Sequence, residues 1–159
     1  MTTESAREEK IGAILTAKGY TLATAESCSG GLIAHRITNV AGSSSYFLGG
    51  IVSYNNDAKT RLLGVDADSI SAHGAVSEEV AGAMARGARD RFAADVAVGV
   101  TGIAGPGGGT REKPVGLVCI AVTGPAGTVV ETCQFDGDRE AVKERTSEKA
   151  LTMILEQIG

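Results

Sequence analysis

The order of two apolar periodicities along the chain constrains the fold more than any other feature of the sequence. Apolar residues recur at helical spacing in some segments and form short strand-like runs in others, and the two kinds alternate. The pattern predicts helices over residues 5–17, 29–40, 58–63, 77–92 and 139–158, and strands over residues 20–25, 46–54, 95–101, 115–122 and 128–135. This alternation, with a hairpin turning at residues 123–127, predicts a layered α/β fold with a mixed sheet.

Size and composition predict one cytoplasmic domain spanning residues 1–159. The chain has 159 residues, of which 43% are hydrophobic, and this length is within the usual range of a single domain. No apolar run reaches the ~20 residues that span a bilayer, and the first ten residues are polar, so we expect no membrane association. The net charge of −4 argues against nucleic acid as a partner. The three scattered cysteines fit neither a disulfide framework nor a zinc site.

Three loops that follow predicted strands, after residues 25, 54 and 101, carry the residues suited to chemistry. Ligands of open α/β sheets bind outside the carboxyl ends of the strands. Ser27 lies where a strand turns into a helix beginning at Gly30-Gly31, a position that suits a nucleophile. The unpaired N–H groups at the start of that helix are suited to stabilise an oxyanion or to bind a phosphate. On position alone, an alternative is favoured in which Ser27 or Ser29 is only the N-cap of that helix.

A base for Ser27 is harder to find in the sequence. His35 lies inside a predicted helix and His73 in a His-Gly turn, so neither histidine is well placed. Lys59 follows the second strand and suits a Ser-Lys pair if it is desolvated. Considered alone, Lys59 is more often a solvated helix residue, and Tyr54 more often a strand-edge residue than a proton relay.

The glycine-rich loop over residues 102–114 is the most unusual stretch of the chain. It lacks the Gly-Lys-Ser/Thr ending of a phosphate-binding loop and no helix follows it, so it is neither a Walker loop nor a dinucleotide fingerprint. The loop is either functional or a flexible connection. Arg111, Lys113 and Arg139 are suited to hold a phosphate, although each by itself is more often a surface charge.

Several ordered motifs resemble the CinA C-terminal-domain family across nearly the whole chain. They comprise residues 24–31 (TAESCSGG), 49–55 (GGIVSYN) with Lys59, 73–77 (HGAVS), 101–106 (TGIAGP), 113–116 (KPVG) and 137–139 (GDR). The resemblance implies a three-layer α/β/α sandwich. It also implies an enzyme without a metal or cofactor that hydrolyses the carboxamide of nicotinamide mononucleotide to nicotinate mononucleotide and ammonia.

The same resemblance implies roles for individual residues. Ser27 would be the nucleophile, Lys59 its base and Tyr54 an aid to proton transfer, with Thr101 and Ser44 lining the site and holding the oxyanion or the substrate. The remaining substrate-binding residues that it implies are Gly30, Gly31, Gly102 and Arg139, of which Arg139 contacts the phosphate or supports the structure. A homo-oligomer, in the commonest case a dimer, is also implied.

Two other functions remain open from the sequence. The chain is alternatively an inactive nucleotide-binding or interaction module related to competence and DNA damage, in which case Ser27 and Lys59 are dispensable. Another pyridine nucleotide is also compatible as the substrate, because glycine loops recognise phosphate better than base identity. The sequence does not decide whether Cys28 is reactive or simply packed.

Overall fold

A computed structural model describes residues 3–159, in which five strands form one mixed sheet in the order β2-β1-β3-β4-β5. The strands are β1 (Leu22–Glu26), β2 (Phe47–Val52), β3 (Val96–Gly102), β4 (Leu117–Gly124) and β5 (Gly127–Gln134). Strand β1 is parallel to β2 and β3, whereas β4 is antiparallel to β3 and β5. The predicted mixed sheet is therefore confirmed.

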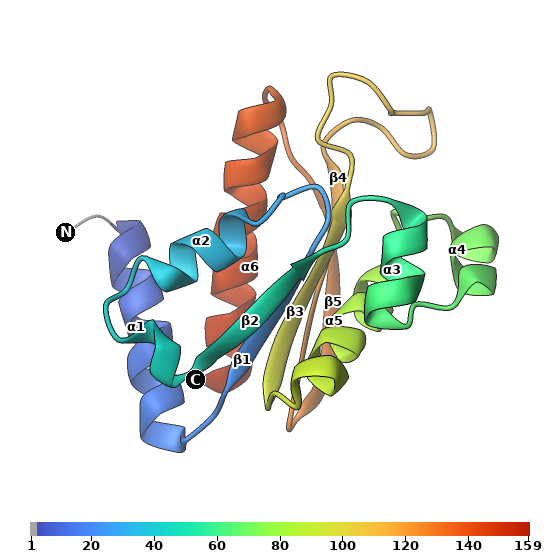
Figure 1. Cartoon of the computed structure of the whole chain (residues 1–159). Coiled ribbons are helices and arrows are strands. Elements are labelled where there is room, and N and C mark those ends of the chain that lie inside the picture. The colour runs from blue at the N-terminus through green and yellow to red at the C-terminus, as the bar shows by residue number, and fades with distance from the viewer. Residues whose placement is uncertain (1–2) are drawn as a thin grey trace.

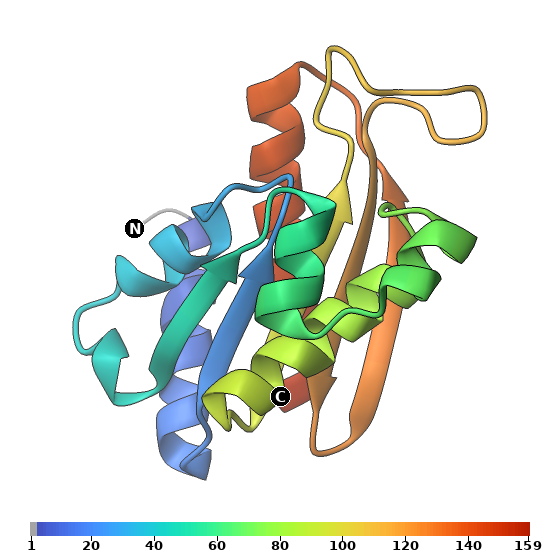
Figure 2. The same cartoon turned by 45° about the vertical axis from the view of Figure 1, so that its right-hand side comes forward.

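Helices cover both faces of this sheet, as Figures 1 and 2 show. They are α1 (Thr3–Lys18), α2 (Leu32–Thr38), α3 (Asn56–Leu63), α4 (Ala67–His73), α5 (Glu78–Phe92) and α6 (Arg139–Ile158), with a 3-10 helix η1 (Ser43–Ser45). Helices α1, α2 and α6 lie on one face, and α5, joined by α3 and α4, lies on the other (Figure 1). The three-layer α/β/α prediction is confirmed. No helix in residues 3–159 combines the length and hydropathy needed to cross a membrane.

The two faces of the sheet pack differently. Branched side chains such as Leu15, Val98 and Ile154 fill the layer beneath α1 and α6. The α5 face uses small residues instead, and at Gly99 of β3 a Cβ atom would lie only 2.5 Å from the backbone oxygen of Ala81. Helix α5 thus approaches the strand backbone closely enough that glycine is needed there.

Two local predictions differ from the structure. Strands β4 and β5 pair as far as Gly124 and Gly127, so Pro125 and Ala126 alone form the turn that was expected to span residues 123–127. Helix α4 was not predicted, and the reason is that none of its residues is buried, so it has no periodic apolar face in the sequence.

The parallel half of the sheet determines where the functional loops meet. Strands β1, β2 and β3 run in the same direction, so residues 26, 52 and 102 end at one edge of the sheet. The glycine-rich segment after β3 projects beyond this same edge (Figures 1 and 2). The expectation that the loops after the first three strands converge is confirmed.

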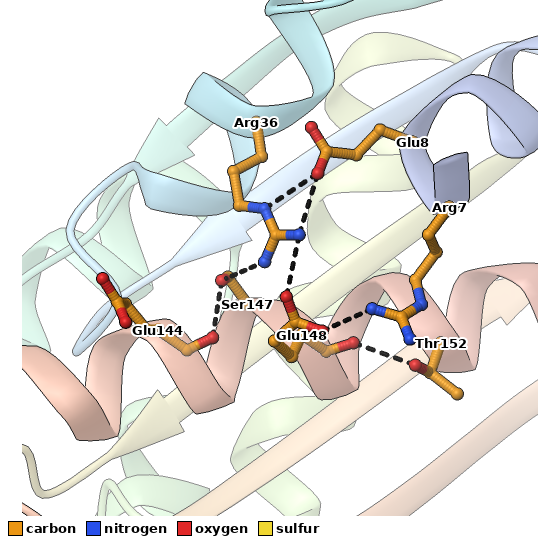
Figure 3. Close-up of polar contacts among 7 residues, drawn as sticks. All are labelled: Arg7, Glu8, Arg36, Glu144, Ser147, Glu148 and Thr152. Atoms are coloured by element: carbon orange, nitrogen blue, oxygen red, sulfur yellow. Dashed lines mark hydrogen bonds and ion pairs between the residues drawn. The ribbon is translucent and has the colours of Figure 1, made fainter. Parts of the chain in front are cut away.

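A buried cluster of charges joins α1, α2 and α6 (Figure 3). Arg36 of α2 donates to Glu8 Oε1 from Nε at 3.0 Å and from Nη2 at 2.8 Å, and to Ser147 Oγ from Nη1 at 2.7 Å. Its Nη2 atom also lies 3.0 Å from Glu148 Oε1, and Glu148 pairs with Arg7. Every nitrogen of the Arg36 guanidinium therefore has a partner from another helix.

Candidate active site

The turn between β1 and α2 presents Ser27 at the carboxyl edge of the sheet. The Gly30 N–H donates to the Ser27 carbonyl at 3.0 Å, which closes a tight turn. Gly30 and Gly31 have φ angles of +63° and +102°, values that L side chains rarely adopt, so this turn requires glycine. Ser27 itself is only 7% exposed.

Glu26, rather than a serine, caps helix α2. Its buried carboxylate accepts from the N–H groups of Ile33 at 2.9 Å and Ala34 at 3.0 Å, and from Ser29 Oγ at 2.7 Å. The N-cap position is Gly31, which has no side-chain oxygen to offer. The alternative in which Ser27 or Ser29 is the N-cap is therefore wrong, because Glu26 bonds the helix N-terminus instead.

Lys59 is buried beside Ser27. Asn55 caps α3 by accepting from the Ala58 N–H at 2.7 Å, and the first turn of this helix directs Lys59 inward. Its ammonium Nζ donates to Ser27 Oγ at 3.2 Å and to the Ser53 carbonyl at 3.1 Å, and the side chain is only 2% exposed. The interpretation of Lys59 as a solvated helix residue is wrong.

Burial changes the pKa of Lys59 and of the neighbouring Cys28. Desolvation lowers the pKa of Lys59, because an ammonium loses hydration in the interior. A negative charge on Cys28 would oppose this effect, but desolvation raises the pKa of the Cys28 thiol to about 12, so the thiol stays neutral while Lys59 titrates. Cys28 is consequently a packed residue and no thiolate nucleophile.

A cavity of about 240 Å³ opens in front of Ser27. Backbone of the glycine-rich loop forms much of its wall, including Gly102, Gly105, Gly107 and Gly108. At Gly102 a Cβ atom would lie 2.9 Å from Cys28 Sγ, so the loop and the Ser27 turn are in direct contact there. The residues predicted on the first and third loops are thus brought together.

Tyr54 and Arg139 border this cavity on the side of α6. Asp138 caps α6 by accepting from the Ala141 N–H at 2.9 Å, which fixes Arg139 in the first turn. Arg139 Nη1 donates to the Gly105 carbonyl at 2.6 Å, and its Nη2 donates to the Tyr54 hydroxyl. A second cavity of about 470 Å³ shares Ala104 and Arg139 with the first, so Arg139 lies between the two.

Other predicted residues lie elsewhere or have different contacts. The buried Thr101 hydroxyl donates to the Ala75 carbonyl at 2.9 Å. Ser44 lies in η1, before the start of β2, and therefore at the opposite end of that strand from the Ser27 cavity. Lys113 Nζ donates to the His73 carbonyl at 2.7 Å, and Arg111 is exposed. Within residues 3–159 there is no cluster of three or more His, Cys, Asp or Glu side chains that fits a metal ion.

Sequence reasoning missed two groups that shape the site. Glu26 holds α2 in place next to Ser27, and the Ser53 carbonyl fixes the Lys59 ammonium. A charged residue at the end of an otherwise apolar strand was a usable signal for Glu26. No sequence signal identifies a single carbonyl such as that of Ser53, because every residue has one.

Known proteins resemble the chain over nearly its full length. The family described as CinA C-terminal domain matches residues 4–158. A CinA-like protein of Mycolicibacterium gilvum is 57% identical over 92% of this chain, and a putative competence-damage inducible protein of Symbiobacterium thermophilum is 54% identical over 95%. The chain spans only 35% and 38% of the length of these two relatives.

Solved structures agree with this assignment. The crystal structure of the competence/damage inducible protein CihA from Agrobacterium tumefaciens has a TM-score of 0.94 and 42% identity, covering 98% of this chain and 95% of that one. A competence or damage-inducible protein from Enterobacter asburiae has a TM-score of 0.95 and 31% identity, with both chains fully covered. The chain therefore belongs to the CinA family, as a C-terminal domain of that family.

Proposed function

We propose that this chain hydrolyses the carboxamide of nicotinamide mononucleotide to nicotinate mononucleotide and ammonia, with Ser27 as nucleophile and Lys59 as base. The observation that carries the proposal is the buried Lys59 ammonium, whose hydrogen-bond partners are two neutral oxygens, one of them Ser27 Oγ. A lysine with a lowered pKa beside a serine hydroxyl is an arrangement that activates the hydroxyl for attack.

The proposed reaction proceeds in two halves. Neutral Lys59 takes the Ser27 proton as Ser27 Oγ attacks the carboxamide carbon, and the resulting ammonium then protonates the departing nitrogen, which leaves as ammonia. An ester between Ser27 and the nicotinate group remains. Lys59, again neutral, deprotonates a water that attacks this ester, and the proton returns to Ser27 Oγ as the acid is released.

Developing negative charge on the carbonyl oxygen requires donors that are already in place. An amide is a poor electrophile, and each such donor contributes roughly 3 kcal/mol to the transition state. The main chain of the Ser27 turn and of the glycine-rich loop lines the cavity, and we assign the role of donor to its N–H groups. This role explains why glycines crowd the loop that faces Ser27.

The phosphate of the substrate is assigned to Arg139. This guanidinium lies between the cavity in front of Ser27 and the larger cavity beside it, so a nucleotide with its ring at Ser27 extends toward Arg139. Planar guanidinium groups bind phosphate through paired hydrogen bonds. Binding would exchange the present contacts of Arg139 with Tyr54 and Gly105 for contacts with phosphate oxygens.

Ammonia release from nicotinamide mononucleotide tests the proposal. We expect the purified chain to release ammonia, the Ser27→Ala variant to release none, and a chelator to leave the wild-type rate unchanged. Binding of the nucleotide without ammonia release by the wild-type chain would contradict the proposed reaction and favour a binding module. Equal release by wild type and Ser27→Ala would exclude Ser27 as the nucleophile.

A further inference from the structure

Residues 73–77, which join α4 to α5, form a motif of the sequence that the proposed reaction does not use. Of the described residues, none in this 73–77 segment lines the cavity in front of Ser27. Local hydrogen bonds hold the segment in one shape: the Ser77 hydroxyl donates to the Gly74 carbonyl at 2.9 Å, and its oxygen accepts from the Val80 N–H at 3.2 Å. The segment is therefore a fixed support whose other carbonyl groups can bind neighbouring elements.

Side chains at both ends of the glycine-rich loop donate to this segment. Thr101, at the end of β3, donates from its buried hydroxyl to the Ala75 carbonyl at 2.9 Å. Lys113, in the returning part of the loop, donates from Nζ to the His73 carbonyl at 2.7 Å. The loop leans toward the side of the molecule that carries α4 (Figures 1 and 2). The loop backbone that lines the Ser27 cavity thus lies, along the chain, between two contacts with the same support.

Lys113 has the geometry of an anchor between the loop and the 73–77 segment. Its side chain is half-buried, and a Cβ atom at Gly74 would lie only 2.6 Å from its Nζ. Gly74 has a φ of +82°, so the ammonium lies against a position that favours glycine. The backbone of Lys113 is held as well, because its N–H donates to Thr110 Oγ1 at 3.0 Å and its carbonyl accepts from the Thr110 N–H at 2.8 Å. Lys113 therefore ties a closed turn of the loop to the support.

Another side chain also holds the loop, but the proposed reaction releases it. Arg139 Nη1 donates to the Gly105 carbonyl at 2.6 Å, a contact that Arg139 exchanges for phosphate in the proposed complex. The contact between Lys113 and the His73 carbonyl lies outside the cavity, so the substrate does not compete for it. Lys113 consequently keeps the loop attached to the 73–77 segment after phosphate has taken Arg139.

We propose that Lys113 is a positioning residue, which holds the glycine-rich loop against the Ser27 cavity by binding the His73 carbonyl. Glycine loses more conformational freedom on ordering than any other residue, so a cavity wall built largely of glycine backbone needs a restraint from outside. Donors stabilise an oxyanion best when they are in place before the charge develops. Lys113 supplies the restraint, and the N–H groups of the loop act as the donors.

This role differs from the phosphate contact that the sequence suggests for Lys113. A side chain that binds phosphate stabilises the bound substrate, and its loss raises KM. A positioning residue acts through the donors, whose contact with the carbonyl oxygen is strongest in the transition state, so its loss lowers kcat and leaves KM nearly unchanged. The inference rests on the proposed function, because the rate that it concerns is that of ammonia release.

Steady-state ammonia release from nicotinamide mononucleotide by the full chain measures this division between kcat and KM. We expect Lys113→Met to lower kcat by about 10- to 100-fold, with KM within about twofold of wild type. Lys113→Arg should recover most of the rate, because a guanidinium also donates to a carbonyl. Arg111→Met is the matched control, because it removes an exposed cation of the same loop, and both constants should stay within about twofold of wild type. An unchanged kcat for Lys113→Met, a rise in KM alone, or no recovery in Lys113→Arg would overturn the proposal.

Backbone NMR relaxation tests the restraint independently of the reaction. In the wild type the amides of Gly107, Gly108 and Gly109 should have order parameters of about 0.85, and in Lys113→Met these should fall below about 0.6 while the amides of β3 stay rigid. Arg111→Met should keep the wild-type values. If the wild type releases no ammonia, the proposed function fails and the positioning role fails with it, whereas the order parameters still decide whether Lys113 fixes the loop. Unchanged order parameters in Lys113→Met would contradict the anchoring contact whatever the activity.

Discussion

Lys59 and Arg36 are both buried cations, yet their surroundings are opposite. The Arg36 guanidinium meets the carboxylates of Glu8 and Glu148 within a cluster that joins three helices (Figure 3). The Lys59 ammonium meets the hydroxyl of Ser27 and a backbone carbonyl, and it forms no ion pair within the described residues. Burial without a counter-charge is costly, so the fold keeps at Lys59 a group that readily gives up its proton.

This comparison separates a structural charge from a chemical one. The Arg36 guanidinium is paired with carboxylates and joins three helices through its hydrogen bonds. An unpaired lysine has a lowered pKa and becomes a base, which is how the proposed reaction uses it. We therefore expect the removal of Lys59 to reduce activity and the removal of Arg36 to reduce stability.

The largest expected effect is the loss of turnover when Lys59 is changed. Lys59→Met should lower ammonia release by roughly 10³-fold, since no base then remains beside Ser27. Lys59→Arg should be as inactive, because a guanidinium does not lose its proton. Arg61→Met, an exposed change on the same helix, should leave the rate within about twofold of wild type. Activity retained by Lys59→Arg would show that positive charge, and not proton transfer, is what the site needs.

Removing Arg36 should affect stability instead. Arg36→Met leaves the buried Glu8 carboxylate without its partner, and we expect the free energy of unfolding to fall by about 3–5 kcal/mol in denaturant titrations. Adding Glu8→Leu to this variant should restore much of the loss, because both buried charges are then gone. Arg61→Met removes an exposed pair with Asp57 and should cost at most ~1 kcal/mol. A loss for Arg36→Met no larger than that for Arg61→Met would rule out a structural role for the cluster.

The smallest effect expected is a gain in stability on removing Lys59. At neutral pH Lys59→Met should raise the free energy of unfolding by about 1 kcal/mol, as commonly seen when a strained functional group is replaced. Because the folded-state pKa of Lys59 lies below its ordinary 10.5, the wild type gains stability as pH rises through that pKa toward 10.5. The advantage of Lys59→Met should therefore shrink with rising pH, as measured by unfolding curves at several pH values. A destabilised Lys59→Met would mean that the ammonium contributes to folding.

Much of the fold is predictable from local patterns. The apolar periodicities gave the five strands and five of the six α-helices, because most of these elements bury apolar side chains at regular spacing. The edge strands β2 and β5 are buried only in part. Helix α4 escaped because it is a short surface helix that buries no residue. The predicted hairpin turn is longer than the observed one. Thr123 pairs with Thr128 and belongs to a strand, although it lies beside the turn-forming glycine and proline residues.

The candidate site is only partly predictable in the same way. Ser27 and its neighbouring glycines are marked by the sharp change from strand to helix, whereas the burial of Lys59 depends on how α3 packs at the end of the parallel strands. The capping of α2 by Glu26 joins groups seven and eight residues apart, and the Arg36 cluster spans 111 residues from α2 to Ser147. Contacts of that sequence separation exist only in the folded chain.

Titration of the lysine side chains by NMR tests the central claim most directly. With the lysines labelled at the ε-carbon and Lys59 assigned through Lys59→Arg, Lys59 should titrate below 10.5, because desolvation lowers its pKa. Lys149 supplies an internal reference, because its hydrogen bond to Glu131 raises its pKa from the same ordinary value. The account predicts that Lys59 loses its proton at lower pH than Lys149. A Lys59 midpoint at or above that of Lys149 would contradict it.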